Sequence, residues 1–312
     1  KLYRIKLEAD YLAYLAYKGA HERYGEVLTE EQQERILFEL HIMKTMGFPG
    51  YFLIVMDFIR AAREELGVSV GPGRGSAAGS VVAYCLHITD LDPLKYDLLF
   101  ERFLNPDRIS LPDIDTDFDD VGRPKVIDWV TERYGKTHVA HIVTYGKLAT
   151  KSAIADVGRV QRLPLAKVAE LKSYIPDRNF PDNIKDEKGK SPKVNLKNCY
   201  KYVDELKHEF EMGEPNVREV LEYAKQLEDT NRQVGIHACG IIIGADDLTK
   251  FAPLSSVYDP KLKKRVLVTQ YDGHVIESVG LIKMDFLGLI TLNIIKECIK
   301  NIKKRTGEVV DI

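Results

Sequence analysis

The run Pro112-Asp113-Ile114-Asp115-Thr116-Asp117-Phe118 alternates acidic and non-acidic residues with period two, and the rest of the chain is best understood from it. In a β-strand this alternation places Asp113, Asp115 and Asp117 on one face. Three neighbouring carboxylates repel one another unless a cation lies among them, and their hard oxygen ligands suit Mg²⁺. Carboxylates two apart lie about 6.6 Å apart along a strand, a span that accommodates two ions about 3.5–4 Å apart. The alternative is an acidic loop in which the aspartates form turns.

A glycine-rich motif follows a short predicted strand at 68–70 and reads Gly71-Pro-Gly-Arg-Gly-Ser-Ala-Ala-Gly-Ser80. The apolar residues after it, about 81–87, predict a helix. Glycines allow backbone N–H groups to approach a phosphate, while Arg74 adds a cation and Ser76 adds a hydroxyl. No Gly-Lys-Ser/Thr follows, so this is not a Walker loop, and the loose dinucleotide pattern lacks its acidic partner about 20 residues on. A tight turn without a ligand is the alternative.

A second alternating stretch lies near the end of the chain and reads Gly280-Leu-Ile-Lys-Met-Asp-Phe286. As a strand it places Leu281, Lys283 and Asp285 on one face. Lys283 and Asp285 then either form a plain ion pair or complete a metal and phosphate site. Further strands are predicted at 139–145, 240–244 and 266–270. Helices are predicted at 3–24, 29–46, 51–66, 98–104, 124–134 and 291–304.

Residues 147–228 differ from the rest because apolar stripes at helical spacing run through them, with a polar, lysine-rich connection at 181–198. We interpret this region as a helical insertion with a basic face. Its first half carries the basic residues Lys147, Lys151, Arg159, Arg162, Lys167 and Lys172. A merely solvated face is the alternative. Strands and helices in this arrangement predict an α+β fold.

Composition limits the possible functions of the 312 residues. The formal net charge is −2, so any contact with DNA requires a local basic patch or a metal at the acidic run. The four cysteines are far apart without a CxxC, which indicates buried or incidental thiols in a reducing compartment, not a disulfide frame or zinc site. No signal peptide or membrane-spanning apolar run is found, and we expect a cytoplasmic protein without a membrane partner. A first residue other than Met suggests an excerpt from a larger protein.

Five motifs, in this order and spacing, closely resemble bacterial replicative DNA polymerase III alpha subunits, which are C-family DNA polymerases. The motifs occupy residues 71–80, 88–93, 98–106, 112–118 and 281–289. The resemblance implies a nucleotidyltransferase palm like that of DNA polymerase beta, a mixed sheet with flanking helices, and a helical thumb inserted into it. The palm would comprise residues 1–146 and 234–290, the thumb 147–233, and the start of the fingers 291–312.

The resemblance also implies roles for individual residues. Asp113 and Asp115 match the first two metal-binding, catalytic aspartates and Asp285 the third, together holding two Mg²⁺ ions, whereas Asp117 is expected to be structural. The residues expected at the triphosphate of the incoming nucleotide are Arg74, Gly75, Ser76, Arg102 and Lys283. One departure is Cys239, in His237-Ala-Cys-Gly240, where the family commonly has Gly or Ala. We expect this segment to lie outside the catalytic constellation.

The implied function is template-directed DNA synthesis, in which a deoxynucleotide is transferred from a dNTP to a primer 3′-hydroxyl. Expected partners are primer-template DNA, which Lys147 and Lys151 would contact, the dNTP, and the sliding clamp and other replisome subunits through regions absent from this chain. A metal-dependent phosphoesterase or nuclease is one rival, although a hydrolase needs neither the glycine loop nor Lys283 as a triphosphate cradle. The other rival is a fragment that binds DNA without polymerising.

Overall fold

A mixed six-stranded sheet organises the computed structural model, which describes residues 2–106, 112–260 and 262–310. The strand order is β1-β6-β3-β2-β5-β4. β1 is parallel to β6 and β2 to β5, whereas β3 is antiparallel to β6 and β4 to β5. The strands are β1 (Asp115–Asp119), β2 (Val139–Lys147), β3 (Asn231–Ile243), β4 (Leu254–Asp259), β5 (Lys264–Asp272) and β6 (Lys283–Leu289).

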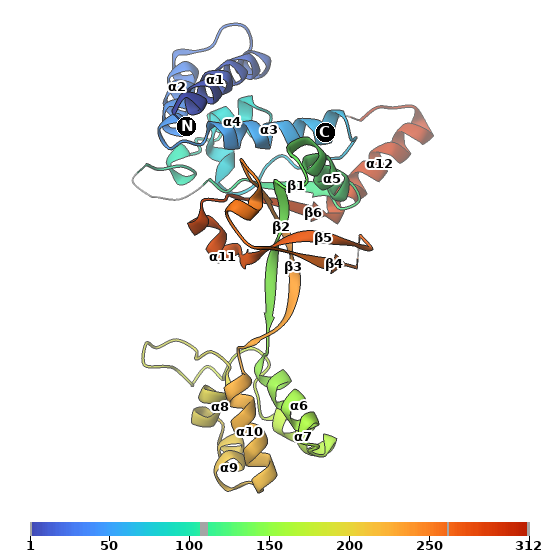
Figure 1. The fold of residues 1–312 in the computed structure, drawn as a ribbon. Coiled ribbons are helices and arrows are strands. Elements are labelled where there is room, and N and C mark those ends of the chain that lie inside the picture. Colours follow the sequence, from blue (N-terminus) through green and yellow to red (C-terminus); the bar gives the residue numbers. More distant parts are fainter. Residues whose placement is uncertain (1, 107–111, 261, 311–312) are drawn as a thin grey trace. The chain divides into compact units, whose positions relative to one another are not determined.

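The chain divides into two units (Figure 1). One contains the residues up to Val143 and those from Ile236 onward, and the other is Thr144–Gly235. The chain leaves the first unit along β2 and returns to it along β3. The insertion predicted at residues 147–233 falls within the second unit.

Several helices of the first unit begin where the sequence supplies start signals. α2 opens with a capping box, in which Thr29 and Gln32 exchange hydrogen bonds, and α3 and α5 have proline in their first turn. The helices are α1 (Leu2–Tyr24), α2 (Glu30–Thr45), α3 (Pro49–Glu64), α4 (Val81–Cys85), α5 (Arg123–Tyr134), α11 (Gly273–Ile276) and α12 (Ile290–Thr306). Short 3₁₀ turns are η1 (Gly75–Gly79), η2 (Phe100–Arg102), η3 (Leu248–Lys250) and η4 (Glu277–Val279).

The main core lies where one face of the sheet meets the helices. Phe286 of β6 packs against Phe58 of α3 and Phe118 of β1, with ring centroids 4.6 and 5.4 Å apart. All three rings are fully buried. Because side chains alternate along a strand, the residues next to Phe118 and Phe286 point to the opposite face. The aspartates of β1 and β6 are therefore directed away from this core.

The second unit, Thr144–Gly235, has a hydrophobic core of its own. Buried side chains such as Ile154, Leu171 and Leu221 supply it from three different helices. The helices are α6 (Thr150–Val160), α7 (Leu165–Ser173), α8 (Leu196–Tyr202), α9 (Asp204–Met212) and α10 (Pro215–Leu227). Residues 174–195 form no helix, and most of them lie in the polar connection predicted at 181–198. Prolines at positions 176, 181 and 192 explain the interruption, since proline cannot donate the helical hydrogen bond.

Several predicted strands and helices differ from the structure. The strand at 68–70 is reduced to one bridge between Val70 and Phe118, because the glycine loop turns away directly afterwards. The helix at 98–104 is only η2, and β6 begins at Lys283 instead of residue 280. Leu281, predicted on the strand, lies before it and is buried in a small cluster with Ile242. β4 was not predicted, and its pairing with β5 determines it.

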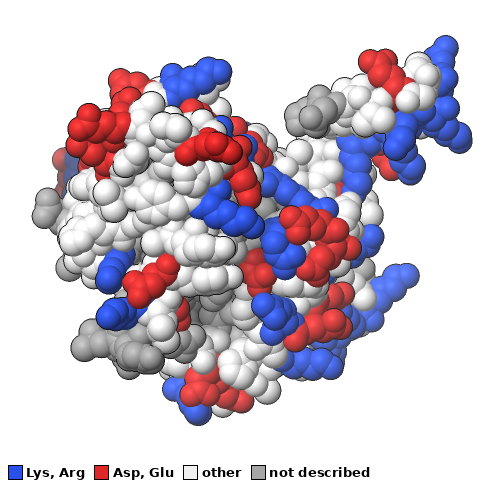
Figure 2. Space-filling model, turned by 90° about the horizontal axis from the view of Figure 1, so that it is seen from above, with Lys and Arg blue, Asp and Glu red and all other residues white. Residues whose placement is uncertain are grey.

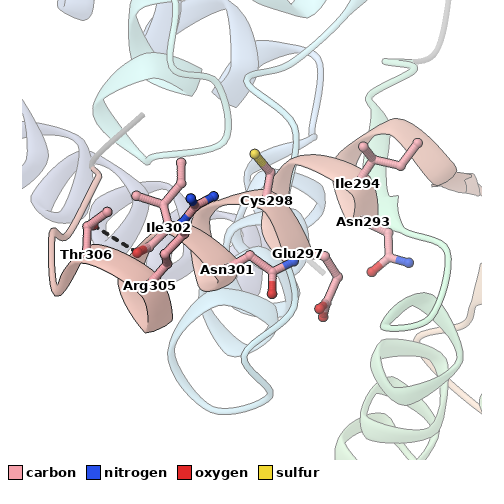
Figure 3. A pocket seen from close by; sticks show the side chains of 8 residues that line it. All are labelled: Asn293, Ile294, Glu297, Cys298, Asn301, Ile302, Arg305 and Thr306. Atoms are coloured by element: carbon pink, nitrogen blue, oxygen red, sulfur yellow. Dashed lines mark hydrogen bonds between the residues drawn. The ribbon is translucent and has the colours of Figure 1, made fainter.

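α12 is the most exposed long element, with no buried residue. Lys296 ties it to the sheet by donating to the Gly67 carbonyl at 2.7 Å and to Asp119 Oδ2 at 3.1 Å. Figure 3 shows Ile294 and Cys298 among the side chains that line a hollow beside this helix. Within the described ranges, no single helix is long and apolar enough to cross a membrane; α2 and α3, bent by 112°, meet that criterion only as a pair.

Candidate active site

Three carboxylates from two adjacent strands come together at the sheet. Asp115 of β1 lies directly opposite Asp285 of β6 in the parallel register. Asp113 precedes β1, so the prediction that it shares a strand face with Asp115 is wrong. Its segment is held by Tyr51 of α3, whose hydroxyl oxygen accepts the Ile114 N–H at 3.0 Å. Oxygens of Asp113, Asp115 and Asp285 all lie within 4.8 Å of one another.

The electrostatics of this acidic cluster favour a divalent cation. Asp285 is only 7% exposed, and its Oδ1 is buried without a hydrogen-bond partner in the described part of the chain. Burial, and then the charges of Asp113 and Asp285, raise the pKa of Asp115. The donor set consists of oxygens alone, which is the preference of Mg²⁺. The residues present therefore fit the metal that the sequence predicts, and the orphaned oxygen supplies an available ligand.

Asp117 shares the alternation but has different surroundings. It lies opposite Leu287 in the strand register and is buried, and burial raises its pKa. Its Oδ1 lies 3.5 Å from Arg74 Nη1, so a cation from the glycine loop faces it. Asp117 is not part of the three-carboxylate group. Its contacts connect β1 to the loop.

Lys283 is the cation next to the acidic cluster. Its Nζ lies 2.5 Å from Asp285 Oδ2, and its side chain is one-quarter exposed. Burial lowers the pKa of Lys283, but the hydrogen bond and charge of Asp285, with the charges of Asp113 and Asp115, raise it overall. The ammonium group therefore stays charged at neutral pH and remains beside the carboxylates.

The glycine loop starts against β1, where the Gly71 N–H donates to the Asp117 carbonyl at 2.8 Å. Gly73 and Gly75 have φ of +104° and +65°, a conformation that other residues rarely adopt. The loop positions Arg74 toward Asp117, whereas Ser76 is exposed in η1.

Arg102 is also exposed, in the turn η2 that packs against the loop. The packing is close, because a Cβ on Gly79 would lie 2.7 Å from the Leu99 carbonyl oxygen. The two turns therefore present Ser76 and Arg102 to solvent from one closely packed pair of segments.

A buried carboxylate on α2 holds this loop, and no pattern in the sequence indicated its role. Glu39 is fully buried and accepts hydrogen bonds from Ser80 Oγ and from the N–H groups of Val81 and Val82. Arg35 pairs with Glu39 at 2.7 Å and donates to the carbonyls of Gly79 and Leu98. The pair thus fixes both the end of the loop and the segment leading to η2.

The predicted DNA-contacting lysines lie in the second unit, and both form ion pairs. Lys147 Nζ lies 3.4 Å from Asp229 Oδ2, and Lys151 Nζ lies 2.5 Å from Asp177 Oδ1. Asp177 is almost fully exposed, so solvent screens its pair with Lys151, which contributes little to stability. The predicted basic face therefore includes acidic neighbours that a phosphate group would have to displace.

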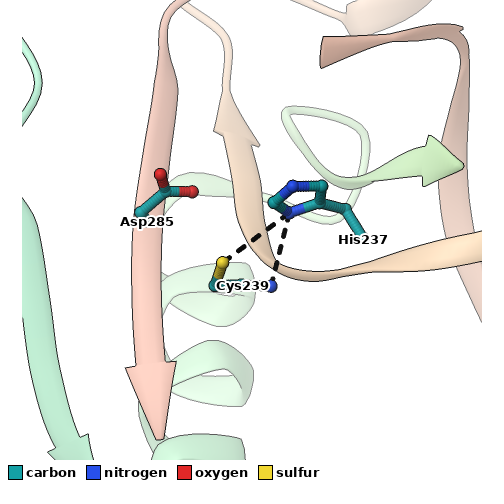
Figure 4. A group of neighbouring side chains, drawn as sticks. All are labelled: His237, Cys239 and Asp285. Carbon is teal, nitrogen blue, oxygen red and sulfur yellow. Dashed lines mark hydrogen bonds between the residues drawn. The ribbon is translucent and has the colours of Figure 1, made fainter. Parts of the chain in front are cut away.

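The segment around Cys239 lies beside the carboxylates, and the prediction that it stands apart is wrong. Gly240 of β3 is opposite Asp285 in the antiparallel register. Just before it, His237 Nδ1 accepts the Gly240 N–H at 2.7 Å and lies 3.8 Å from Cys239 Sγ. Ligand atoms of His237, Cys239 and Asp285 all lie within 4.8 Å of one another, and Figure 4 shows the three side chains together. This proximity depends on the register between β3 and β6, so it could not be predicted from the spacing of the residues in the sequence.

Together, the mixed sheet and the acidic cluster define an α+β protein with a site suited to divalent metal. A family model described as "Bacterial DNA polymerase III alpha NTPase domain" matches residues 10–288. The chain belongs to this family.

Curated relatives are named DNA polymerase III subunit alpha. Those from Thermus aquaticus and Campylobacter jejuni are 49% and 46% identical over 89% and 93% of this chain. One from Neisseria meningitidis is 43% identical over 97% of it. The aligned part covers 21%, 23% and 26% of these relatives, so the chain spans about a quarter of their length or less.

Proposed function

We propose that this chain is the palm and thumb of a replicative DNA polymerase, and that it performs template-directed transfer of a deoxynucleotide from a dNTP to a primer 3′-hydroxyl. The pairing of Asp115 with Asp285, with Asp113 beside them, carries the proposal. It brings residues 170 positions apart (285 − 115) into one oxygen-only cluster. Membership of the family of DNA polymerase III alpha subunits supports this assignment.

In this proposal residues 1–146 and 234–290 form a palm like that of DNA polymerase beta. Residues 147–233 form the thumb, and 291–312 begin the fingers. The separate core of residues 144–235 supports a distinct thumb. Primer-template DNA and dNTP are the proposed partners. A sliding clamp and other replisome subunits would bind regions beyond this chain, in the bacterial cytoplasm.

Asp113, Asp115 and Asp285 would hold two Mg²⁺ ions. When bound, such ions activate the attacking hydroxyl and stabilise charge on the phosphate and leaving group. The carboxylates need not transfer protons, since their role is to fix positions and charge. Lys283, held beside them by Asp285, would place a permanent cation near the triphosphate.

The glycine loop would also contact the triphosphate and help to position it. Gly75 allows the backbone to turn, Ser76 offers an exposed hydroxyl, and Arg74 and Arg102 offer exposed guanidinium groups. Lys147 and Lys151 would contact the phosphate backbone of the DNA duplex, which positions the substrate without selecting its sequence.

Nucleotide incorporation in a full-length subunit containing this chain tests the proposal. Asp113→Asn, Asp115→Asn and Asp285→Asn should each lower incorporation into a labelled primer by at least about 100-fold. Thermal unfolding of the Asp113 and Asp115 variants should stay close to that of the wild type, because removing a repulsive charge does not destabilise the cluster. In Asp285→Asn the amide oxygen can still accept a hydrogen bond from Lys283, which donates to Asp285 in the wild type. Asp117→Asn is the matched control on the same strand and should retain substantial activity.

Two outcomes would contradict this assignment. Equal loss of activity from all four variants would show that the roles along β1 are assigned wrongly. Hydrolysis of DNA or phosphoesters without primer extension by the wild-type subunit would instead indicate a phosphoesterase or nuclease.

A further inference from the structure

We propose that His237, Cys239 and Asp285 form a second metal site, selective for a thiophilic divalent cation of the Zn²⁺ class. The three side chains offer one nitrogen, one sulfur and one oxygen within 4.8 Å of one another (Figure 4). Asp285 belongs both to this site and to the acidic cluster. Occupation of the mixed-ligand site therefore withdraws a carboxylate from the oxygen site.

The ligand atoms are available for coordination. Asp285 Oδ1 is buried and unpartnered in the described part of the chain, so the carboxylate gains a ligand bond without losing a hydrogen bond at that oxygen. His237 Nδ1 lies 3.8 Å from Cys239 Sγ and accepts the N–H groups of Gly240 at 2.7 Å and of Cys239 at 3.4 Å. A metal at Nδ1 would displace these two N–H groups from its lone pair.

The backbone around the site is fixed by Arg123 of α5. Its Nε donates to the Phe286 carbonyl at 2.7 Å, and its Nη2 donates to the Ala238 carbonyl at 2.5 Å. Each of these carbonyls belongs to a residue adjacent in sequence to a proposed ligand. Arg123 therefore holds β3 and β6 at a fixed separation, which reduces the entropy lost when the ligands close on an ion.

The chemistry of the two sites differs although they share Asp285. Thiolate and imidazole ligands favour Zn²⁺, in tetrahedral geometry with Zn–S near 2.3 Å. Mg²⁺ prefers oxygen ligands, as in Asp113, Asp115 and Asp285. Three protein ligands leave a fourth position to solvent. One carboxylate cannot serve both geometries fully, so we expect Zn²⁺ at the mixed-ligand site to weaken divalent-ion binding at the acidic cluster.

Cobalt absorption tests the site directly. Co²⁺ replaces Zn²⁺ in such sites and gives a thiolate-to-metal band in the near ultraviolet. We expect this band in the wild-type chain and in Cys298→Ala, which removes an exposed thiol elsewhere. Cys239→Ala should lose the band and bind Zn²⁺ at least tenfold more weakly in competition with a chromophoric chelator. Alanine is smaller than cysteine and adds no polar group to this partly buried position, so we expect the variant to fold.

His237→Ala should weaken Zn²⁺ binding similarly, whereas Asp113→Asn should change it less than twofold. The proposal is overturned if the wild type shows no thiolate band or if the band persists in Cys239→Ala.

Paramagnetic resonance of Mn²⁺ tests the coupling, which rests on the proposed metal-binding role of the acidic cluster. One equivalent of Zn²⁺ should weaken Mn²⁺ binding at least tenfold in the wild type and much less in Cys239→Ala, where only direct competition at the acidic cluster remains. Equal Mn²⁺ affinity with and without Zn²⁺ in the wild type would overturn the coupling. Absence of Mn²⁺ binding that depends on Asp113 would instead overturn the proposed function, while the cobalt band would still establish the mixed-ligand site.

Discussion

Lys283 forms an ion pair in the structure, and we propose a catalytic role for the same residue. Its ion pair with Asp285 is present in the structure, and the same ammonium would lie near the triphosphate in the proposed reaction. A contact made in the transition state predicts that Lys283→Ala lowers kcat/KM for the nucleotide about 10–100-fold. Affinity for primer-template should stay near the wild-type value. Steady-state kinetics with varied dNTP, beside a melting curve, measure both.

A purely structural ion pair would give a different result for Lys283→Ala. The melting temperature would fall while nucleotide kcat and KM stayed normal, and that combination would exclude the triphosphate role. Lys283→Arg is a second variant for comparison, because it keeps the positive charge but replaces the ammonium with a planar guanidinium group. Partial recovery of kcat/KM in this variant is expected.

Glu39 anchors the end of the glycine loop, which we propose contacts the triphosphate. Removing a buried, fully hydrogen-bonded carboxylate leaves Arg35 and the first N–H groups of α4 without their partner. We expect Glu39→Ala to lower the free energy of unfolding by about 3–5 kcal/mol, measured in urea. Glu34→Ala, an exposed change on the same helix, should stay within about 0.5 kcal/mol of wild type. Equal values for the two variants would contradict the anchoring role.

At the scale of elements, local patterns predicted some features and missed others. Period-two alternation is a property of a single strand, so it predicted that β1 and β6 each carry inward and outward faces. The Asp115–Asp285 pairing depends on a register between distant segments, and only the family resemblance suggested it. β4 contains adjacent serines without alternation, so its conformation depends on pairing with β5. The nearness of Cys239 to Asp285 likewise depends on the β3–β6 register.

The prediction about DNA binding concerns two lysines of the second unit, Lys147 at the end of β2 and Lys151 on α6. Each lysine that contacts phosphate releases counterions, so Lys147→Ala with Lys151→Ala should reduce the salt slope of primer-template binding by about 1.8. Competition from Asp229 and Asp177 would make the decrease smaller. Fluorescence anisotropy at several salt concentrations measures the slope. Lys188→Ala with Lys190→Ala, exposed positions elsewhere in the unit, are the control. An unchanged slope and affinity in the first pair would mean that the lysines are only solvated.

At the scale of the whole molecule, a buried histidine makes stability depend on pH. Burial, and then the charge of Arg123, lower the pKa of His141 to about 4. The unfolded chain binds this proton below about pH 6.5 and the folded chain does not, so stability falls as the pH falls from about 6.5 to 4. At pH 5 the expected loss is about 2 kcal/mol relative to pH 7.

Comparing the wild type with His141→Gln isolates this effect, because the raised pKa values of Asp115 and Asp117 act in the opposite direction. Urea unfolding at pH 5 and pH 7 should show the wild type losing about 2 kcal/mol more than the variant. Parallel pH profiles for the two proteins would show that His141 does not titrate differently in the folded state.

The pairing of β1 with β6 also has a consequence during synthesis on the ribosome. At about 5–20 residues per second, the 170 residues between Asp115 and Asp285 (285 − 115) require roughly 10–30 s. Through that interval the hydrogen-bonding edge of the nascent β1 has no β6 to pair with, and an unpaired edge invites association with another chain. Asp113, Asp115 and Asp117 oppose this, because two copies of the same acidic segment repel each other. Two of these carboxylates, Asp113 and Asp115, are proposed to bind metal in the folded protein, and they would thus first help to keep neighbouring nascent chains on a polysome apart.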